Sequence, residues 1–169
     1  MLDRECDDVT MLAVQEKEEI VERAASRRHP STSYAGDLLP SEAWSLLSSH
    51  DDAVLVDVRT QPEWSFVGTP DLRTLHREVL PISWRLDPDM TQNISFVEEL
   101  AHRMPNVDVP LLFLCRTGVR SQDAAQAMAA RGYTQCFNII FGFEGDGNEA
   151  GRRGEVNGWK AERLPWCQA

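Results

Sequence analysis

The chain has no apolar run that approaches the length of a membrane-spanning helix, and its longest uninterrupted runs are the length of a strand. It also has little positive charge: 17 lysines and arginines stand against 27 aspartates and glutamates, so the net charge is −10 at pH 7. General nucleic-acid binding depends on clustered basic residues, and this balance argues against it. The first residues, Met-Leu-Asp-Arg-Glu-Cys, lack the basic and then apolar layout of a secretory signal. We therefore expect a cytoplasmic protein with neither a membrane nor a nucleic acid as its partner.

Cysteine and histidine are scarce and widely spaced. The four cysteines show no CxxC spacing, and the four histidines show no ligand spacing; they are Cys6, Cys115, Cys136, Cys167, His29, His50, His76 and His102. In a chain without an export signal, this pattern indicates neither a disulfide framework nor a zinc site. We expect no metal and no cofactor.

The remaining composition is that of an ordinary soluble globular protein. A hydrophobic fraction of 42%, a charged fraction of 26% and a length of 169 residues suit one domain with a full-sized core. Residues 9–28 are rich in glutamate early and in arginine late, with weak amphipathic spacing, and a linker beginning His29-Pro follows them. We predict an acidic helical extension over residues 1–32, which either docks or frays, and a domain over residues 33–169.

Strand and helix patterns alternate through that domain. Apolar runs predict strands at residues 53–58, 79–82, 109–114 and 135–140. Helical patterns follow Ser41 as N-cap, cover residues 91–103, and occupy the alanine-rich run that ends at Gly132. This alternation predicts an α/β fold with a central parallel sheet and helices on both faces, and ligands bind such sheets beyond the carboxyl ends of their strands.

The turn between the strand at 109–114 and the alanine-rich helix carries the most chemical information. It opens with Cys115, and Arg116 and Arg120 lie beside it. Unpaired N–H groups of the turn, the positive end of the helix dipole and the two guanidinium groups all favour an anion there. The same field favours the thiolate, which is the nucleophilic form of cysteine. The turn therefore predicts a seat for an anionic substrate with a nucleophile in its floor.

Two further motif matches near the C-terminus are false. The segment Gly145-Asp-Gly-Asn-Glu-Ala150 fits the letters of a dinucleotide fingerprint, but no helix pattern follows it. It also resembles a calcium loop at Asp146, Asn148 and Gly151, yet it lacks the closing glutamate because Asn157 stands there. We predict a surface loop.

The sequence resembles the rhodanese family of sulfurtransferases from about Tyr34 to Pro165. Leu55-Val-Asp-Val-Arg59 with Glu63-Trp64 is similar to the first signature of that family. Leu114-Cys-Arg-Thr-Gly-Val-Arg-Ser121 is similar to its six-residue active loop, and Gly158-Trp-Lys-Ala-Glu-Arg-Leu-Pro165 to its closing segment. The chain departs from the family in a longer, charged stretch after Gly68 and in an insertion over residues 144–157.

The resemblance implies a rhodanese-like domain and a role for each residue of the loop. Cys115 would take up a sulfane sulfur as a persulfide, cradled by the loop residues Arg116, Thr117, Gly118, Val119 and Arg120. The two arginines would attract a small anionic sulfur donor such as thiosulfate and stabilise the departing sulfite, and a thiol or cyanide would accept the sulfur. Asp57 and Arg59 would form the neighbouring wall, where a structural role through buried charge pairing is at least as plausible as a catalytic one.

Three alternatives stay open at this point. A cysteine-dependent phosphatase or arsenate reductase needs five residues between its cysteine and arginine, whereas four separate Cys115 from Arg120 and Ser121 occupies the required place. A non-catalytic interaction module would not need an activated thiol. A relay that passes persulfide sulfur to a protein acceptor fits the sequence as well as transfer to a small molecule does.

Overall fold

The computed structural model describes residues 3–168, and its centre is a sheet of five parallel strands. In chain order these are β1 (Gly36–Leu38), β2 (Val54–Asp57), β4 (Leu80–Pro81), β7 (Leu111–Leu114) and β8 (Cys136–Ile139). Their order across the sheet is β1-β8-β7-β2-β4. The parallel sheet predicted from the sequence is confirmed, and it places the ends of β2 and β7 side by side, with Asp57 in register with Leu114.

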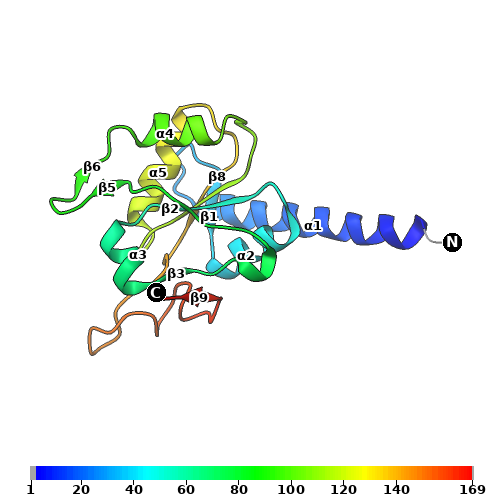
Figure 1. Ribbon diagram of the computed structural model, residues 1–169. Helices are drawn as coiled ribbons and strands as arrows, with labels where there is room; N and C mark the ends of the chain where they lie inside the picture. The colour runs from blue at the N-terminus through cyan, green and yellow to red at the C-terminus, as the bar shows by residue number, and fades with distance from the viewer. Residues whose placement is uncertain (1–2, 169) are drawn as a thin grey trace.

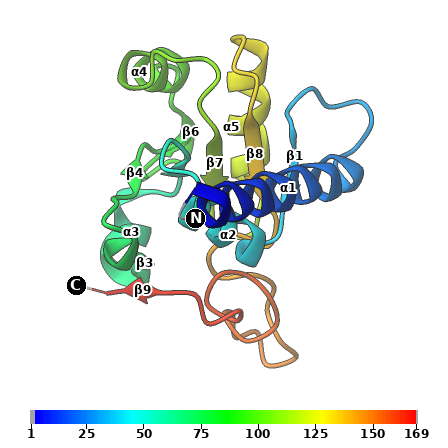
Figure 2. The ribbon, with the colours of Figure 1, turned by 90° about the vertical axis from the view of Figure 1, so that its right-hand side faces the viewer.

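Helices cover both faces of the sheet (Figure 2). On one face, α1 (Asp3–Arg27) and α2 (Pro40–Ser49) pack on a core that includes Leu55, Leu112 and Phe137. On the other face, α4 (Phe96–Arg103) and α5 (Val119–Ala130) pack on a core that includes Val56 and Phe113. Because successive side chains of a strand point to opposite faces, the apolar runs of β2 and β7 supply both cores at once.

Shorter elements surround the carboxyl edge of the sheet (Figure 1). The helix α3 (Gln61–Val67) follows β2, and a 3-10 turn, η1, spans Arg73–Leu75. The strand β3 (Thr69–Pro70) pairs antiparallel with β9 (Trp166–Cys167), which brings the C-terminal segment beneath α3. A small hairpin of β5 (Arg85–Leu86) and β6 (Thr91–Gln92) precedes α4.

Two predicted helix starts are wrong. The helix α2 begins at Pro40 with Leu39 as its N-cap, because Glu42 accepts the N–H of Leu39 at 3.0 Å and proline suits the first helical position; Ser41 is therefore inside the helix. The helix expected over 91–103 begins only at Phe96. Asn93 bonds the carbonyl of Ser83 and the N–H of Ser95, and this fixes a turn between the hairpin and the helix.

The C-terminal part of α1 docks on the sheet, while its N-terminal part projects from the body of the molecule (Figure 1). Ile20 and Ala24 are buried against β1. A Cβ on Gly36 would lie 2.4 Å from the backbone of Ala24, so this close contact requires glycine. Arg27 also donates to the Glu42 carboxylate of α2 at 2.6 and 2.8 Å. Among the described residues, no helix is long and apolar enough to cross a membrane.

Candidate active site

Cys115 follows directly on β7 and begins the loop that leads into α5. Its side chain is buried, with an exposed fraction of 1%. Gly118 adopts φ = +102°, which non-glycine residues rarely adopt, and donates its N–H to the Cys115 sulfur at 3.1 Å. The predicted loop between strand and helix is therefore present, with one backbone donor aimed at the sulfur.

The segment after β8 supports this loop from behind. Phe143 donates its N–H to the Cys115 carbonyl at 2.8 Å, and Glu144 donates to the Arg116 carbonyl at 3.0 Å. Gly142 approaches so closely that a Cβ there would lie 2.3 Å from the same Cys115 carbonyl. These contacts fix the carbonyls of Cys115 and Arg116 in place. This support was not predicted from the sequence, because it comes from residues 27 and 28 positions away.

A buried polar chain also reaches the sulfur, and sequence analysis missed it. The Ser121 hydroxyl oxygen lies 3.2 Å from the Cys115 sulfur and 2.6 Å from Asn138 Oδ1. Asn138 donates from Nδ2 to Asp37 Oδ1 at 2.8 Å, and the Tyr34 hydroxyl donates to the same oxygen at 3.0 Å. Burial, together with the charge of Asp37, raises the pKa of Tyr34 to about 12. The only available signal was the polar residue Asn138 within an otherwise apolar strand.

The two arginines of the loop have different surroundings. Arg120 was expected to serve the anionic donor, but it forms a bidentate ion pair with Glu63 of α3 at 2.7 and 2.8 Å. Burial alone would raise the pKa of Glu63, but hydrogen bonds from Arg120 and from the Thr60 N–H lower it to about 2. Arg116 is exposed, and no carboxylate within residues 14–168 lies at ion-pair distance from it.

A cavity of about 480 Å³ lies at the mouth of the loop. Its lining combines two arginines, two glutamates and apolar side chains: Thr60, Glu63, Val67, Met90, Arg116, Arg120 and Glu144. Because Arg120 and Glu63 neutralise each other, the arginine that remains available to an incoming anion is Arg116.

Asp57 and Arg59 pair with each other, as their positions at the end of β2 allow. Both side chains are fully buried, and Arg59 Nη2 lies 2.6 Å from Asp57 Oδ2 and 2.8 Å from the Gly68 carbonyl. The guanidinium also stacks 4.1 Å from the centre of the Phe143 ring, which belongs to the segment that supports the active loop. The pair therefore ties the end of β2 to the end of α3 and to the support of the loop.

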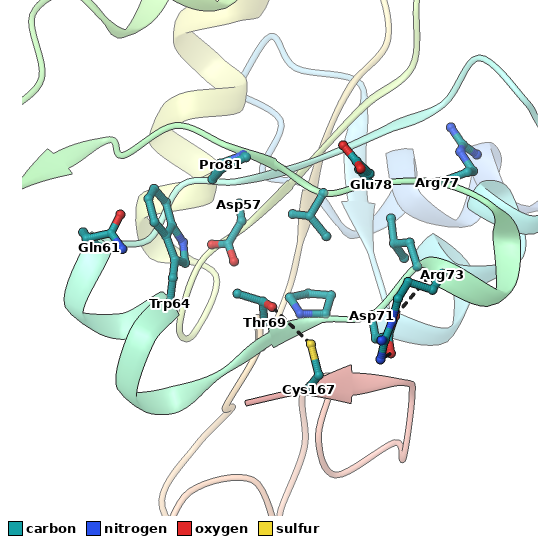
Figure 3. Close-up of a pocket in the computed structure, with 13 residues that line it drawn as sticks. Asp57, Gln61, Trp64, Thr69, Asp71, Arg73, Arg77, Glu78, Pro81 and Cys167 are labelled. Carbon is teal, nitrogen blue, oxygen red and sulfur yellow. Dashed lines mark hydrogen bonds and ion pairs between the residues drawn. The ribbon is translucent and has the colours of Figure 1, made fainter. Parts of the chain in front are cut away.

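A second cavity, of about 440 Å³, lies on the other side of α3 (Figure 3). Asp57, Trp64, Thr69 and Cys167 face it from four different elements. Cys167 is exposed, whereas Cys136 is buried in the core, where burial raises the pKa of its thiol to about 12. Cys6 lies outside the residues whose side chains the structure describes.

The segment over residues 144–157 folds on itself. Asp146 and Asn157 are joined by two hydrogen bonds of 2.8 Å, and Asn148 Oδ1 accepts the N–H groups of Ala150 and Arg152. Within the described part of the chain, no group of three or more histidine, cysteine, aspartate or glutamate side chains is arranged to hold a metal ion. The oxygens of the apparent calcium loop are thus engaged in the fold of the loop itself.

Comparisons with known proteins assign a family to this chain. The family model described as STR4 middle domain matches residues 38–169. An uncharacterised protein of Rickettsia conorii is 38% identical over 131 residues, which are 77% of this chain and 95% of that protein. The thiosulfate:glutathione sulfurtransferase of Saccharomyces cerevisiae is 29% identical over 90 residues, or 53% of this chain and 61% of that protein.

Solved structures share the fold of this chain. The crystal structure of Rv0390 from M. tuberculosis has a TM-score of 0.75 and 47% identity, and it covers 81% of this chain and 100% of that chain. The polysulfide-sulfur transferase homodimer of Wolinella succinogenes, with a TM-score of 0.52 and 19% identity over 96% of this chain and 89% of that chain, shares the fold. The chain therefore belongs to the STR4 middle domain family, and its α/β fold is rhodanese-like.

Proposed function

We propose that the protein is a sulfurtransferase that carries a sulfane sulfur on Cys115. The observation that carries this proposal is the buried sulfur at the end of β7, with the Gly118 N–H aimed at it, in a loop whose Arg116 and Arg120 line a cavity. The thiosulfate:glutathione sulfurtransferase among the relatives supports the same chemistry. Thiosulfate, or an anion of similar size, is the donor that we propose.

The reaction proceeds in two displacement steps. The Cys115 thiolate attacks the outer sulfur of thiosulfate; a new S–S bond forms, the S–S bond of thiosulfate breaks, and sulfite leaves with the bonding pair. A thiolate or cyanide then attacks the terminal sulfur of the persulfide and takes it as a persulfide or as thiocyanate. The bonding pair returns to Cys115, which is again a thiolate, so no oxidant or reductant is consumed.

Arg116 and Arg120, which line the cavity at the mouth of the loop, have different roles in this reaction. Arg116, exposed and without an ion-pair partner within residues 14–168, attracts the donor and stabilises the departing sulfite. Arg120 contributes positive charge close to the sulfur but is held in place by Glu63. The backbone of Thr117, Gly118 and Val119 forms the rest of the cradle.

The arrangement argues against phosphatase or arsenate reductase chemistry. Those enzymes use a guanidinium that faces the cysteine sulfur across the loop. Here Ser121 occupies that sequence position and places a hydroxyl beside the sulfur, while Arg120 turns toward Glu63. A single sulfur atom needs less room and less charge than a phosphoryl group.

A protein acceptor is the second candidate, and one observation favours it. Val119 in the loop and Met90 at the mouth are apolar side chains with exposed fractions of 66% and 44%. Such side chains beside a reactive sulfur suit docking of a partner that presents its own thiol.

Intact mass spectrometry after incubation with thiosulfate tests the proposal. We expect a gain of one sulfur atom that cyanide or a thiol reductant removes. A protein that stays unmodified under these conditions, while Cys115 remains reduced and the fold intact, would contradict it.

A further inference from the structure

We propose that Asn138 and Asp37 are positioning residues that direct the single hydroxyl proton of Ser121 away from Cys115 until the sulfur becomes anionic. The observation is the buried chain that runs from Asp37 through Asn138 and Ser121 to the sulfur. Its geometry stands by itself, whereas its role in catalysis rests on the proposed function.

The contact with Asp37 fixes the orientation of the Asn138 amide. Asp37 carries a carboxylate, which only accepts hydrogen bonds, and its Oδ1 lies 2.8 Å from one end of this amide. That end must therefore be the NH₂ group, because two oxygens at this distance would repel each other. The amide oxygen consequently faces Ser121, 2.6 Å from its hydroxyl oxygen.

The single proton of the Ser121 hydroxyl has two neighbouring acceptors, Asn138 Oδ1 and the Cys115 sulfur. A hydroxyl has one proton and two lone pairs, so Ser121 cannot donate both to Asn138 Oδ1 and to the sulfur. Since Asn138 Oδ1 is a buried acceptor and Ser121 is its donor, the proton goes to Asn138 and a lone pair faces Cys115. When the Cys115 sulfur carries a proton, Ser121 thus accepts its S–H, and the Gly118 N–H remains the donor to the sulfur.

The consequence for sulfur transfer follows from the charge on the sulfur atom. In the persulfide, the inner sulfur is neutral and needs no donor, so the Ser121 proton can stay with Asn138. When an acceptor removes the terminal sulfur, the inner sulfur becomes a thiolate. The Ser121 hydroxyl then turns its proton to the sulfur and leaves Asn138 Oδ1 without a donor. The chain therefore opposes release of the thiolate and retains the persulfide until an acceptor attacks.

Other charged and titratable groups surround Cys115, and the charges among them must be held constant in any test. They come from the loop and α5, from α3, from the end of β2, from β1 and from the preceding and supporting segments: Arg116, Arg120, Glu63, Asp57, Arg59, Asp37, Tyr34 and Glu144. Asn138 is uncharged, so its replacement alters no charge among them.

The test measures thiolate formation by Cys115 in the reduced protein, without any sulfur donor. Thiolate absorbance in the ultraviolet is titrated with pH, and each variant has its own Cys115→Ala blank. In Asn138→Val, the Ser121 proton has the sulfur as its remaining acceptor. We expect the midpoint to move to lower pH, with about three- to tenfold more thiolate at a pH below the midpoint.

Two further variants distinguish this mechanism from a general effect on the fold. Ser121→Ala should leave the midpoint nearly in place, since it removes both the acceptor of the thiol proton and the donor that the thiolate gains at the expense of Asn138. Adding Asn138→Val to Ser121→Ala should have no further effect, because Asn138 acts through Ser121. Tyr34→Phe, which removes the other donor to Asp37 and leaves Asn138 oriented, is the matched control and should titrate like the wild type.

The opposite pattern would overturn the proposal. If Ser121→Ala moves the midpoint to higher pH while Asn138→Val leaves it unchanged, Ser121 already donates to the sulfur. Should Asn138→Val fail to fold, Asn138→Leu, which also removes the amide and alters no charge, is tested in the same cycle with Ser121→Ala.

A second measurement separates this inference from the proposed function. The persulfide of Asn138→Val should transfer its sulfur to cyanide about three- to tenfold faster than that of the wild type. A shifted thiolate titration in a protein that gains no sulfur from thiosulfate would support the hydrogen-bond chain and contradict the sulfurtransferase. Sulfur loading together with an unshifted titration would support the sulfurtransferase and contradict the role of the hydrogen-bond chain.

Discussion

Arg120 and Glu63 hold each other in a bidentate ion pair at the mouth of the active loop, with N–O distances of 2.7 and 2.8 Å. Their side chains are only 16% and 19% exposed, so removal of either one leaves a mostly buried charge without its partner. The pair also joins α5 to α3, because Arg120 belongs to α5 and Glu63 to α3. Glu63 in turn accepts the N–H of Thr60 at the start of α3. Arg120 is therefore part of the frame of the site, and Arg116 is the exposed charge beside it.

The first prediction concerns donor binding. Arg116→Ala should raise the KM for thiosulfate about tenfold, because an exposed guanidinium at the mouth loses a charge-assisted contact with the anion. Arg103→Ala is the matched control: it removes the same charge from a surface ion pair in α4, with Glu99. Steady-state kinetics with cyanide as acceptor measure both variants. Equal KM values for the two would remove Arg116 from the site.

The second prediction concerns stability at low pH. The pKa of Glu63 is about 2 in the folded protein and near 4.5 when unperturbed, so its ion pair stabilises the fold fully above pH 4.5. This stabilisation, about 3 kcal/mol, should be lost as the pH falls from 4.5 toward 2. Glu63→Gln should lower the free energy of unfolding at pH 7 and flatten its decline in this pH window. Urea denaturation at a series of pH values measures it, and an unchanged slope in Glu63→Gln would contradict the assignment.

The third prediction concerns the residue that carries sulfur. Cys115→Ser should fold normally yet gain no sulfur mass from thiosulfate, because a hydroxyl cannot form a persulfide. Replacement of Cys6, Cys136 and Cys167 together by alanine should leave loading intact, with some loss of stability from the buried Cys136. Loading that survives Cys115→Ser, or that vanishes in a folded triple variant, would show that sulfur is carried elsewhere.

The fourth prediction concerns the shape of the loop. Gly118→Ala should destabilise the protein by about 1–2 kcal/mol and greatly slow persulfide formation, because φ = +102° is strained for alanine and the new Cβ would lie 3.2 Å from the Phe141 nitrogen. Gly132→Ala is the matched control, since its φ is +106° and its Cβ would meet nothing within 4 Å. It should show a similar strain by thermal unfolding but normal sulfur loading. A normal loading rate in Gly118→Ala would mean that persulfide formation does not depend on the direction of the residue 118 N–H.

The position of Cys115 could be predicted from the local sequence pattern alone. An apolar strand, a short turn with glycine and an alanine-rich helix follow one another in the chain, so propensity and periodicity alone place this cysteine between a strand and a helix. The same holds for the parallel sheet, because alternating strands and helices have few other ways to bury their apolar faces. Neither conclusion required a contact between distant residues.

The first residue of two helices could not be predicted from the local sequence pattern, because it depends on hydrogen bonds that the pattern does not reveal. Ser41 has the chemistry of an N-cap, but Glu42 bonds the N–H of Leu39 and sets the start earlier. The residues around Thr91 contain no signal that excludes a helix. Thr91 is nevertheless in a strand, because it pairs with β5.

What the sequence by itself determined is the place of Cys115 between a strand and a helix, the loop that holds it and the class of fold, because these follow from residues adjacent in the chain. Only the tertiary structure decided where the charges point and what surrounds the sulfur. Arg120 turns to Glu63, 57 positions away, and Asp37 reaches Asn138 across 101 positions. Each of these side chains has several possible partners in the sequence. The choice among them is made when the sheet brings particular strand ends together, since burial makes an unpaired charge or hydrogen-bonding group costly.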